Sequence, residues 1–298
     1  MIIMPQKTIN LCNLGNESSL EDYLLSLNIS KTQIKKSDLS KKFLEKKLEK
    51  KEEIQIPLNL VNQGLIFPNY VGPEVEVLFE DSKILCLNKP PKTHCHPLSY
   101  NEQNNMLSFL RQNLYLKKTN FCFERQYEGG LLYRLDFETS GVLFFSKDKE
   151  QYLSIRKNFK DVTKTKEYIC IVNGRFEGSG IYKHFLSPYG LKKSRVRVSE
   201  NGELGQGVIE VSVLNQNIEK NLTLLKVRLF SGIRHQIRVQ LSHLGFPILG
   251  DTLYGGEESD RLFLHAHKYT MLIGDKNYEV TAKNAVLFDC FFNLDSIF

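Results

Sequence analysis

Runs of hydrophobic residues in the second part of the chain predict a sheet-rich structure. Some runs alternate with polar residues, as half-buried antiparallel strands do, and others are continuous, as buried strands are. These segments are Val75–Phe79, Ile84–Leu87, Val142–Phe145, Lys164–Gly174, Val208–Leu214 and Leu222–Leu229. Helical spacing is limited to short stretches between them, such as Leu107–Leu114 and Tyr152–Phe159. The pattern therefore favours an α+β fold.

The first 72 residues have a different pattern. Ser18 and Glu21 form a capping box before apolar residues at helical spacing, and Ser30 and Gln33 form a second one. Both boxes predict short helices. This part of the chain is therefore expected to be mainly helical.

A turn-rich connector separates the two patterns. Ile66–Pro73 contains two prolines and a glycine in eight positions, and these residue types favour turns. We therefore expect a small N-terminal, lysine-rich helical unit at residues 1–72 and a larger domain at 73–298.

The N-terminal part is dense in lysine. Nine lysines lie from Lys31 to Lys51, above a stripe of apolar residues at helical spacing. They form either a solvated helix face or a patch that follows RNA phosphates, because each lysine–phosphate contact releases counterions and adds affinity independent of sequence. Four glutamates within Glu45–Glu53 reduce the charge, so both interpretations remain open.

The composition is that of a globular protein with a modest positive charge. Hydrophobic residues make up 41% and charged residues 25% of the 298 positions, the usual mixture for such proteins. The 40 basic and 34 acidic residues give a net charge of +6, which permits an anionic partner. The six cysteines are scattered, and no apolar run is long enough to span a membrane. We expect reduced thiols and a cytoplasmic protein.

One polar turn stands directly before a predicted buried strand. Its Asp136 lies between Leu135 and Phe137. A carboxylate among apolar neighbours is unfavourable unless a cation or several donors hold it ionised, and Arg134 and Thr139 are nearby candidates. The turn either takes part in catalysis or is an ion-paired turn that only closes a loop.

Three further stretches carry candidate chemistry. Lys89 follows a predicted strand and precedes two prolines, where it is either a phosphate contact or a surface loop charge. Tyr168 lies on a predicted strand, and an aromatic face beside a catalytic carboxylate is a natural platform for a nucleobase. Leu191–Arg197 places four cations on a predicted hairpin arm, either as an RNA contact or as a solvated strand face.

A cationic helix is predicted after the last long strand. Ser231 and Gly232 are favourable residues for a helix start, where free N–H groups attract an anion. Arg234 and Arg238 are four residues apart, so a helix would place both on one face.

Two groups of histidines invite a metal-site interpretation. His94, Cys95 and His96 are adjacent, but nothing nearby in the sequence completes a set of four ligands. His265 and His267 would share one face of a strand, where packing or hydrogen bonding is favoured over metal binding. We expect no metal.

Together these stretches resemble, in order, the motifs of the RluA-type RNA pseudouridine synthases. The family's His-Arg-Leu-Asp, two free positions and Thr-Ser-Gly correspond to Tyr133–Gly141, with tyrosine in place of histidine. Lys89-Pro90 and Lys166-x-Tyr168 are similar to two other family motifs. Gly232–Arg238 resembles Gly-Arg-x-His-Gln-Ile-Arg, with Ile233 in place of arginine.

The resemblance implies the pseudouridine synthase catalytic fold, with a central mixed, mostly antiparallel sheet. It also implies that the protein isomerises uridine in RNA to pseudouridine without a metal, nucleotide or other cofactor. Ribosomal RNA is favoured over transfer RNA as the partner, and a monomer is expected. Many family members carry a small helical RNA-binding domain at the N-terminus, which is the function implied for residues 1–72.

The resemblance also implies roles for individual residues. Asp136 would act on the sugar as nucleophile or base, Arg238 would pair with it, and Tyr168 would stack on the uracil and assist loss of its C5 proton. Arg134 would fill the gap left by the flipped base. The substrate-binding residues would be Arg134, Lys89, Thr139, Arg234, His235 and Gln236.

Two other functions remain open from the sequence. One is an RNA-binding protein whose catalytic fold has lost its activity, for which Tyr133 and Ile233 are the support. The other is a hydrolytic glycosidase that uses Asp136 with a second acid, Glu138 or Asp251. The arginines and tyrosines around a single aspartate favour the isomerase.

Overall fold

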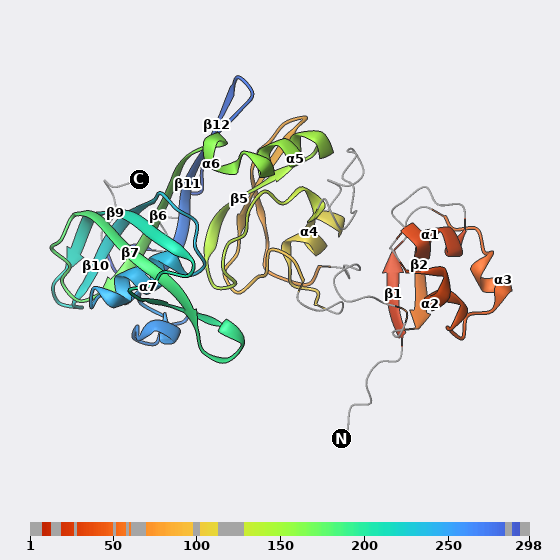
Figure 1. Cartoon of the computed structure of the whole chain (residues 1–298), viewed down its shortest axis with the longest axis horizontal. Coiled ribbons are helices and arrows are strands. Elements are labelled where there is room, and N and C mark those ends of the chain that lie inside the picture. The colour runs from red at the N-terminus through yellow and green to blue at the C-terminus, as the bar shows by residue number, and fades with distance from the viewer. Residues whose placement is uncertain are drawn as a thin grey trace. The chain divides into compact units, whose positions relative to one another are not determined.

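The computed structural model divides into two compact units (Figure 1). It describes residues 8–12, 19–26, 29–49, 52–57, 60, 70–97, 102–112, 128–283 and 288–292. The first unit comprises Met1–Pro73, His94–Gly130 and Lys147–Lys149, and the second comprises Glu74–Thr93, Leu131–Ser146 and Glu150–Phe298. The predicted unit at 1–72 lies within the first unit, which also takes in a segment expected in the larger domain. Of the predicted connector, residues 66–69 lie outside the described part.

The N-terminal part of the first unit combines short helices with a small sheet. Its helices are α1 (Leu20–Ser26), α2 (Lys31–Lys35) and α3 (Lys41–Leu44). β1 (Thr8–Cys12) pairs with β2 (Glu53–Pro57) in an antiparallel sheet that the sequence did not predict. In β2, Ile54 and Ile56 are buried between exposed neighbours, which is the strand period. The same unit contains α4 (Met106–Gln112).

Helix capping explains two of these helices. The predicted box at Ser30 and Gln33 is confirmed, because each side chain caps the other residue's backbone N–H. Ser18 lies outside the described residues, and Ser19 accepts the backbone N–H of Asp22 at the start of α1.

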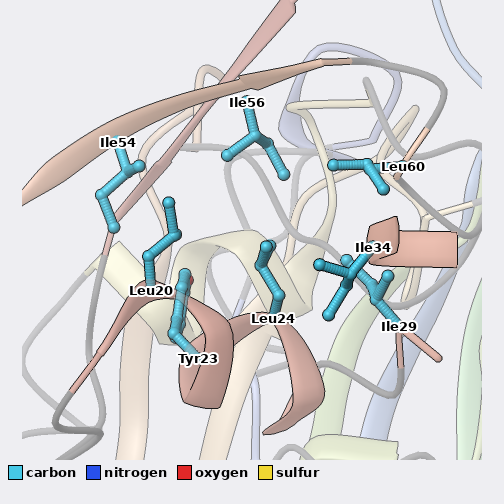
Figure 2. Close-up of a cluster of buried hydrophobic side chains, with 8 residues drawn as sticks. All are labelled: Leu20, Tyr23, Leu24, Ile29, Ile34, Ile54, Ile56 and Leu60. Carbon is cyan, nitrogen blue, oxygen red and sulfur yellow. The ribbon is translucent and has the colours of Figure 1, made fainter. Parts of the chain in front are cut away.

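The helices and β2 enclose a hydrophobic core of their own. Figure 2 shows its eight side chains gathered between α1 on one side and β2 on the other. They are Leu20, Tyr23, Leu24, Ile29, Ile34, Ile54, Ile56 and Leu60. The apolar stripe under the lysines, including Leu39 and Phe43, packs against this core. The lysines that the structure describes between Lys31 and Lys47 are all exposed.

The second unit is built on a ten-stranded sheet (Figure 1). In spatial order the strands are β3 (Glu76–Glu80), β4 (Ile84–Lys89), β5 (Ser140–Ser146), β11 (Leu264–Ile273), β6 (Thr163–Asn173), β10 (Leu222–Leu229), β9 (Gly205–Asn217), β7 (Gly180–Tyr189) and β8 (Arg195–Val198). β12 (Lys276–Thr281) pairs with β11 outside this path. Among the described strands only the β5–β11 pairing is parallel. The predicted mixed, mostly antiparallel sheet is therefore confirmed.

Few helices accompany the sheet. Among the described residues of this unit they are α5 (Lys149–Lys157, whose first residue is in the first unit), α6 (Phe159–Val162) and α7 (Gln236–His243), with short 3-10 turns at Leu191–Lys193 and Thr252–Tyr254; a further 3-10 turn, Glu128–Gly130, belongs to the first unit. Val239 of α7 packs with Leu186 of β7, Val196 of β8 and Tyr254. This cluster holds α7 on the β7–β8 hairpin, which is the predicted arm.

A glycine allows the turn before β5 to approach β11 closely. Gly141 has a φ of +117°, and a Cβ at this position would lie 2.2 Å from the carbonyl oxygen of Ala266. The parallel pairing of Ser140 with His265 and of Gly141 with Ala266 depends on this approach. The residues before Gly141, including Asp136, are thereby held beside the central strand of the sheet.

We expect Gly141→Ala to lower the free energy of unfolding by about 3 kcal/mol, because both the backbone angle and the contact with Ala266 become unfavourable. Gly245→Ala is the matched control, since Gly245 also has a positive φ of +88° but no atom lies within 4 Å of its added Cβ. It should lose only about 1 kcal/mol. Urea unfolding followed by circular dichroism measures both. Equal losses would contradict the close-approach explanation.

Candidate active site

A buried lysine holds the turn that carries Asp136. Lys89 is 0% exposed, and its ammonium group donates to the carbonyl oxygens of Pro90 (2.9 Å), Thr93 (2.7 Å) and Phe137 (3.1 Å). A buried ammonium needs such acceptors. Both interpretations from the sequence, a phosphate contact and a surface charge, are therefore wrong. Lys89 fixes the backbone directly after Asp136.

Asp136 itself is partly open to solvent. Its side chain is 24% exposed. Its Oδ2 lies 3.7 Å from Nη1 of Arg238, and its Oδ1 lies 4.0 Å from Nε2 of His235. Both distances are longer than hydrogen bonds. The carboxylate therefore faces Arg238 and His235 without a hydrogen bond to either, and its exposed part is accessible to a substrate.

Arg238 has a closer partner than Asp136. Its Nε and Nη2 each donate to one carboxylate oxygen of Asp251 at 2.7 Å, in a bidentate pair that is buried on both sides. Nη1 faces Asp136 at 3.7 Å and Glu138 at 3.5 Å. The predicted ion pair with Asp136 is present at 3.7 Å, and the sequence did not predict the closer, hydrogen-bonded partner Asp251.

The effect of neighbouring charges on the pKa of Arg238 is larger than the effect of its burial. Burial alone would lower the pKa of the guanidinium, but the hydrogen bonds to Asp251 and the charges of Asp251, Asp136 and Glu138 raise that pKa above its ordinary value. The cation is therefore fixed, and it presents its one remaining nitrogen to the two carboxylates at the edge of the site.

The helix that contains Arg238 begins later than predicted. α7 starts at Gln236, and His235 before it is left-handed, with a φ of 56°. The amide oxygen of Gln236 accepts the hydroxyl of Ser231 (2.9 Å) and the N–H of Ile233 (3.1 Å), while its nitrogen donates to Val208 (3.2 Å). These bonds fold residues 231–235 into a loop on β9. Gln236 is buried, and its side-chain hydrogen bonds support this loop.

Because of this loop, Arg234 does not share a helix face with Arg238, and that prediction is wrong. The guanidinium of Arg234 instead donates to the carbonyl oxygen of Lys193 and, at 3.4 Å, to that of Arg195. Arg234 thus joins the loop to the basic arm. Ile233, which stands where the family has arginine, packs on the apolar cluster of α7 and the arm.

Two tyrosines, Tyr168 and Tyr133, contact a third, Tyr269. Tyr168 is 5% exposed, and its hydroxyl is 2.8 Å from the hydroxyl of Tyr269. The ring of Tyr133 stacks on that of Tyr269 with centroids 4.5 Å apart, and its hydroxyl donates to Val142 at 2.9 Å. Tyr133, the departure from the family's histidine, is thus part of the support of Tyr168.

The other predicted residues differ in their surroundings. Arg134 is exposed beside Asp136. The N–H of Thr139 donates to the carbonyl of Asp136 at 3.2 Å, while its buried hydroxyl has no partner among the described residues. Lys166 donates to the carbonyl of Ser231 at 2.6 Å, and burial, with the charge of Lys160, lowers its pKa to about 8.

The histidines are occupied by hydrogen bonds. His265 contacts the hydroxyl of Ser140 at 2.8 Å and the carbonyl of Ala282 at 3.2 Å, and His267 contacts the same carbonyl. His94 contacts Glu102. Within the described ranges no three potential ligands are grouped as a metal site, and no helix there is long and apolar enough to cross a membrane.

Sequence analysis missed three residues that shape this site: Asp251, Tyr254 and Tyr269. Asp251 was considered only as a second acid of a glycosidase. Its burial against Arg238 removes it from that role, because such an acid must meet water. In the sequence, only the position of Asp251 in a glycine turn directly after the apolar pair Ile248-Leu249 could have indicated that this aspartate is buried.

Comparison with known proteins agrees with this geometry. The family model described as RNA pseudouridylate synthase matches residues 83–243. An uncharacterized RNA pseudouridine synthase of Helicobacter pylori is 36% identical over 213 residues, which cover 68% of this chain and 76% of that protein. Ribosomal large subunit pseudouridine synthase D of Borreliella burgdorferi is 31% identical over 211 residues, which cover 69% of this chain and 63% of that protein.

A solved structure shows the same fold. Human RNA pseudouridylate synthase domain containing 1 superposes with a TM-score of 0.59 at 22% identity, covering 72% of this chain and 86% of that one. The matched sequence contains the turn of Asp136, the tyrosine strand and the loop before Arg238, in the order of the family's motifs. The chain therefore belongs to the RluA-type family of RNA pseudouridine synthases, isomerases that act on uridines in RNA.

Proposed function

We propose that this chain isomerises specific uridines of ribosomal RNA, with Asp136 as the catalytic carboxylate. The observation that carries the proposal is a partly exposed carboxylate on a rigid turn, with a buried arginine 3.7 Å away. Relatives named ribosomal large subunit pseudouridine synthase D, such as those of Borreliella burgdorferi and Buchnera aphidicola, support ribosomal RNA as the substrate. Transfer RNA is the alternative to be tested.

The proposed reaction needs one carboxylate and an enclosed site that keeps the detached uracil from leaving. The bond from C1′ of the ribose to N1 of the uracil breaks, the uracil turns, and C5 bonds to C1′. The C5 proton is then lost and N1 gains a proton, so the atoms of substrate and product balance. Asp136 acts on the sugar, either as a nucleophile at C1′ or as a base, and is regenerated at the end.

The neighbouring residues receive roles that follow from their surroundings. Arg238 supplies positive charge to Asp136, and Tyr168 faces the uracil with its hydroxyl held by Tyr269. Arg134, exposed beside Asp136, is suited to fill the space left by the flipped base. Thr139 and Arg234 hold the turn and the arm around that base.

RNA phosphates beyond the target nucleotide require further cations, which each of the two units exposes. The exposed lysines of Lys31–Lys47 and the arginines of the arm, Arg195 and Arg197, are the proposed phosphate contacts. Free cysteines such as Cys86 and Cys170 agree with a reducing, cytoplasmic setting. The proposed enzyme acts as a monomer without a cofactor.

We expect Asp136→Asn to abolish tritium release from RNA labelled at uridine C5, because the amide cannot act on the sugar. Folding and RNA affinity should change little, since Asp136 makes no short side-chain hydrogen bond with Arg238 or His235. Asp275→Asn, at an exposed turn, is the matched control and should keep the wild-type rate. Turnover by Asp136→Asn would remove this residue from the mechanism.

A second prediction separates the two roles of Arg238. Arg238→Met leaves the buried Asp251 without its partner, so we expect a loss of about 3 to 5 kcal/mol in the free energy of unfolding. Adding Asp251→Leu should restore most of this stability but not the turnover, because Asp136 still lacks its cation. Stability is measured by urea unfolding and turnover by tritium release. A double variant as active as wild type would exclude a role of Arg238 in catalysis.

The lysine surface is tested by the salt dependence of RNA binding. Replacing Lys31, Lys35, Lys36, Lys42 and Lys47 by Gln should reduce the slope of log Kd against log salt by about 0.7 to 0.9 for each phosphate contact that is lost. The turnover of bound RNA should not change. The same five positions changed to Arg keep the charge and serve as the control. An unchanged slope in the Gln variant would mean that these lysines form only a solvated face.

A further inference from the structure

His235 is held in a backbone conformation that side chains rarely adopt. Its φ is 56°, in the left-handed region, at the position directly before α7. For a residue other than glycine, asparagine or aspartate this conformation costs about 1 to 2 kcal/mol. The consequence is that the imidazole is turned out of the helix and lies between Tyr254 and Asp136.

Tyr254 connects Val196 to His235. The Tyr254 oxygen accepts the backbone N–H of Val196 at 3.1 Å and lies 2.9 Å from Nδ1 of His235. Its own hydroxyl proton has no other acceptor among the described residues, and donation to Nδ1 gives it one. This donation requires an unprotonated Nδ1 and places the proton of the neutral ring on Nε2.

Burial favours the neutral ring that this arrangement needs. Desolvation lowers the pKa of His235 below its ordinary value, the charge of Asp136 opposes this, and Arg238 and Arg234 add to the lowering. A protonated ring would carry a proton on Nδ1 and could not accept the Tyr254 hydroxyl.

The proton on Nε2 points to the catalytic carboxylate. Nε2 lies 4.0 Å from Oδ1 of Asp136, whereas Nη1 of Arg238 lies 3.7 Å from Oδ2. The two carboxylate oxygens thus face different donors. Catalytic hydrogen bonds are often long before substrate binds and shorten in the reacting complex.

We propose that the chain Val196–Tyr254–His235 is a hydrogen-bond relay that directs an N–H group to Oδ1 of Asp136 and fixes the orientation of this carboxylate during the reaction. His235 is then a positioning residue that acts through Asp136, not a residue that binds RNA. The relay begins on β8, so two hydrogen bonds join the basic arm to His235, whose Nε2 faces the carboxylate at 4.0 Å. The inference rests on the role proposed above for Asp136.

Two substitutions of His235 distinguish this role from a purely structural one. Asparagine tolerates the left-handed conformation and can accept the Tyr254 hydroxyl, but it is too short to donate to Asp136. Glutamine places an amide N–H near the position of Nε2, but it fits the left-handed backbone less well. The relay predicts that His235→Gln retains more activity than His235→Asn. A structural role predicts the reverse order.

The third variant, Tyr254→Phe, keeps the ring that packs beside His235 and Arg238 and removes only the hydroxyl. We expect single-turnover rates to fall about 10- to 100-fold for Tyr254→Phe and His235→Asn, with KM changed less than about twofold, because the carboxylate loses its orientation and RNA contacts are untouched. Tyr278→Phe, on β12, is the matched control and should react at the wild-type rate. Wild-type rates for folded Tyr254→Phe and His235→Asn would overturn the relay.

The protonation state is measured without any reaction. In long-range ¹⁵N–¹H spectra of the full chain, the signals of His235 are identified by their loss in His235→Gln. The relay requires a proton on Nε2 in the wild type and a mixture of both tautomers in Tyr254→Phe. A wild type with the proton on Nδ1 would refute it even if no RNA substrate were turned over.

These outcomes are separate from a failure of the proposed function. Activity in Asp136→Asn would remove the catalytic carboxylate itself. Loss of activity in Asp136→Asn together with full activity in the His235 and Tyr254 variants would remove the relay alone.

Discussion

A buried ion pair between Arg238 and Asp251 determines the geometry of the whole site. Its two parallel hydrogen bonds of 2.7 Å lock the start of α7 to the turn before Tyr254. Nη1 lies outside this fork, and it donates to Glu138 at 3.5 Å and faces Asp136 at 3.7 Å. A lysine could not make this arrangement, because it would offer a single point charge to either partner.

Asp136 is positioned by the backbone rather than by its own side chain. Lys89 donates to the carbonyl oxygen of Phe137, the residue after Asp136, and the N–H of Thr139 donates to the carbonyl oxygen of Asp136. Gly141 fixes the turn against β11. Lys89 and the β11 residue Ala266 hold the turn from other parts of the chain, and Thr139 closes it from within. The carboxylate oxygens remain without short hydrogen bonds to Arg238 and His235. A rigid backbone with an unengaged functional group is the arrangement that reduces reorganisation during a reaction.

Much of this could be predicted from local sequence, and the rest depended on contacts distant in sequence. The strands follow from alternation and apolar runs, and the position of Asp136 follows from its turn. The start of α7 was wrong because Ser231 and Gly232 are good local helix starts, while the side chain of Gln236 binds Ser231 and the distant Val208. The burial of Lys89 was likewise missed, because it depends on the carbonyl of Phe137 from another turn. A loop charge and a buried charge look the same in sequence.

The two departures from the family pattern bear on the alternative of an inactive RNA-binding protein. Both residues have a packing role: Tyr133 stacks on Tyr269, and Ile233 packs against the apolar cluster of α7 and the arm. What surrounds Asp136 is unfavourable for stability: a left-handed histidine, a buried ammonium group and a buried ion pair that apolar residues could replace without loss. A protein that only bound RNA would need none of these features at this one turn. Their concentration around Asp136 and Glu138 supports the proposal that chemistry is performed there.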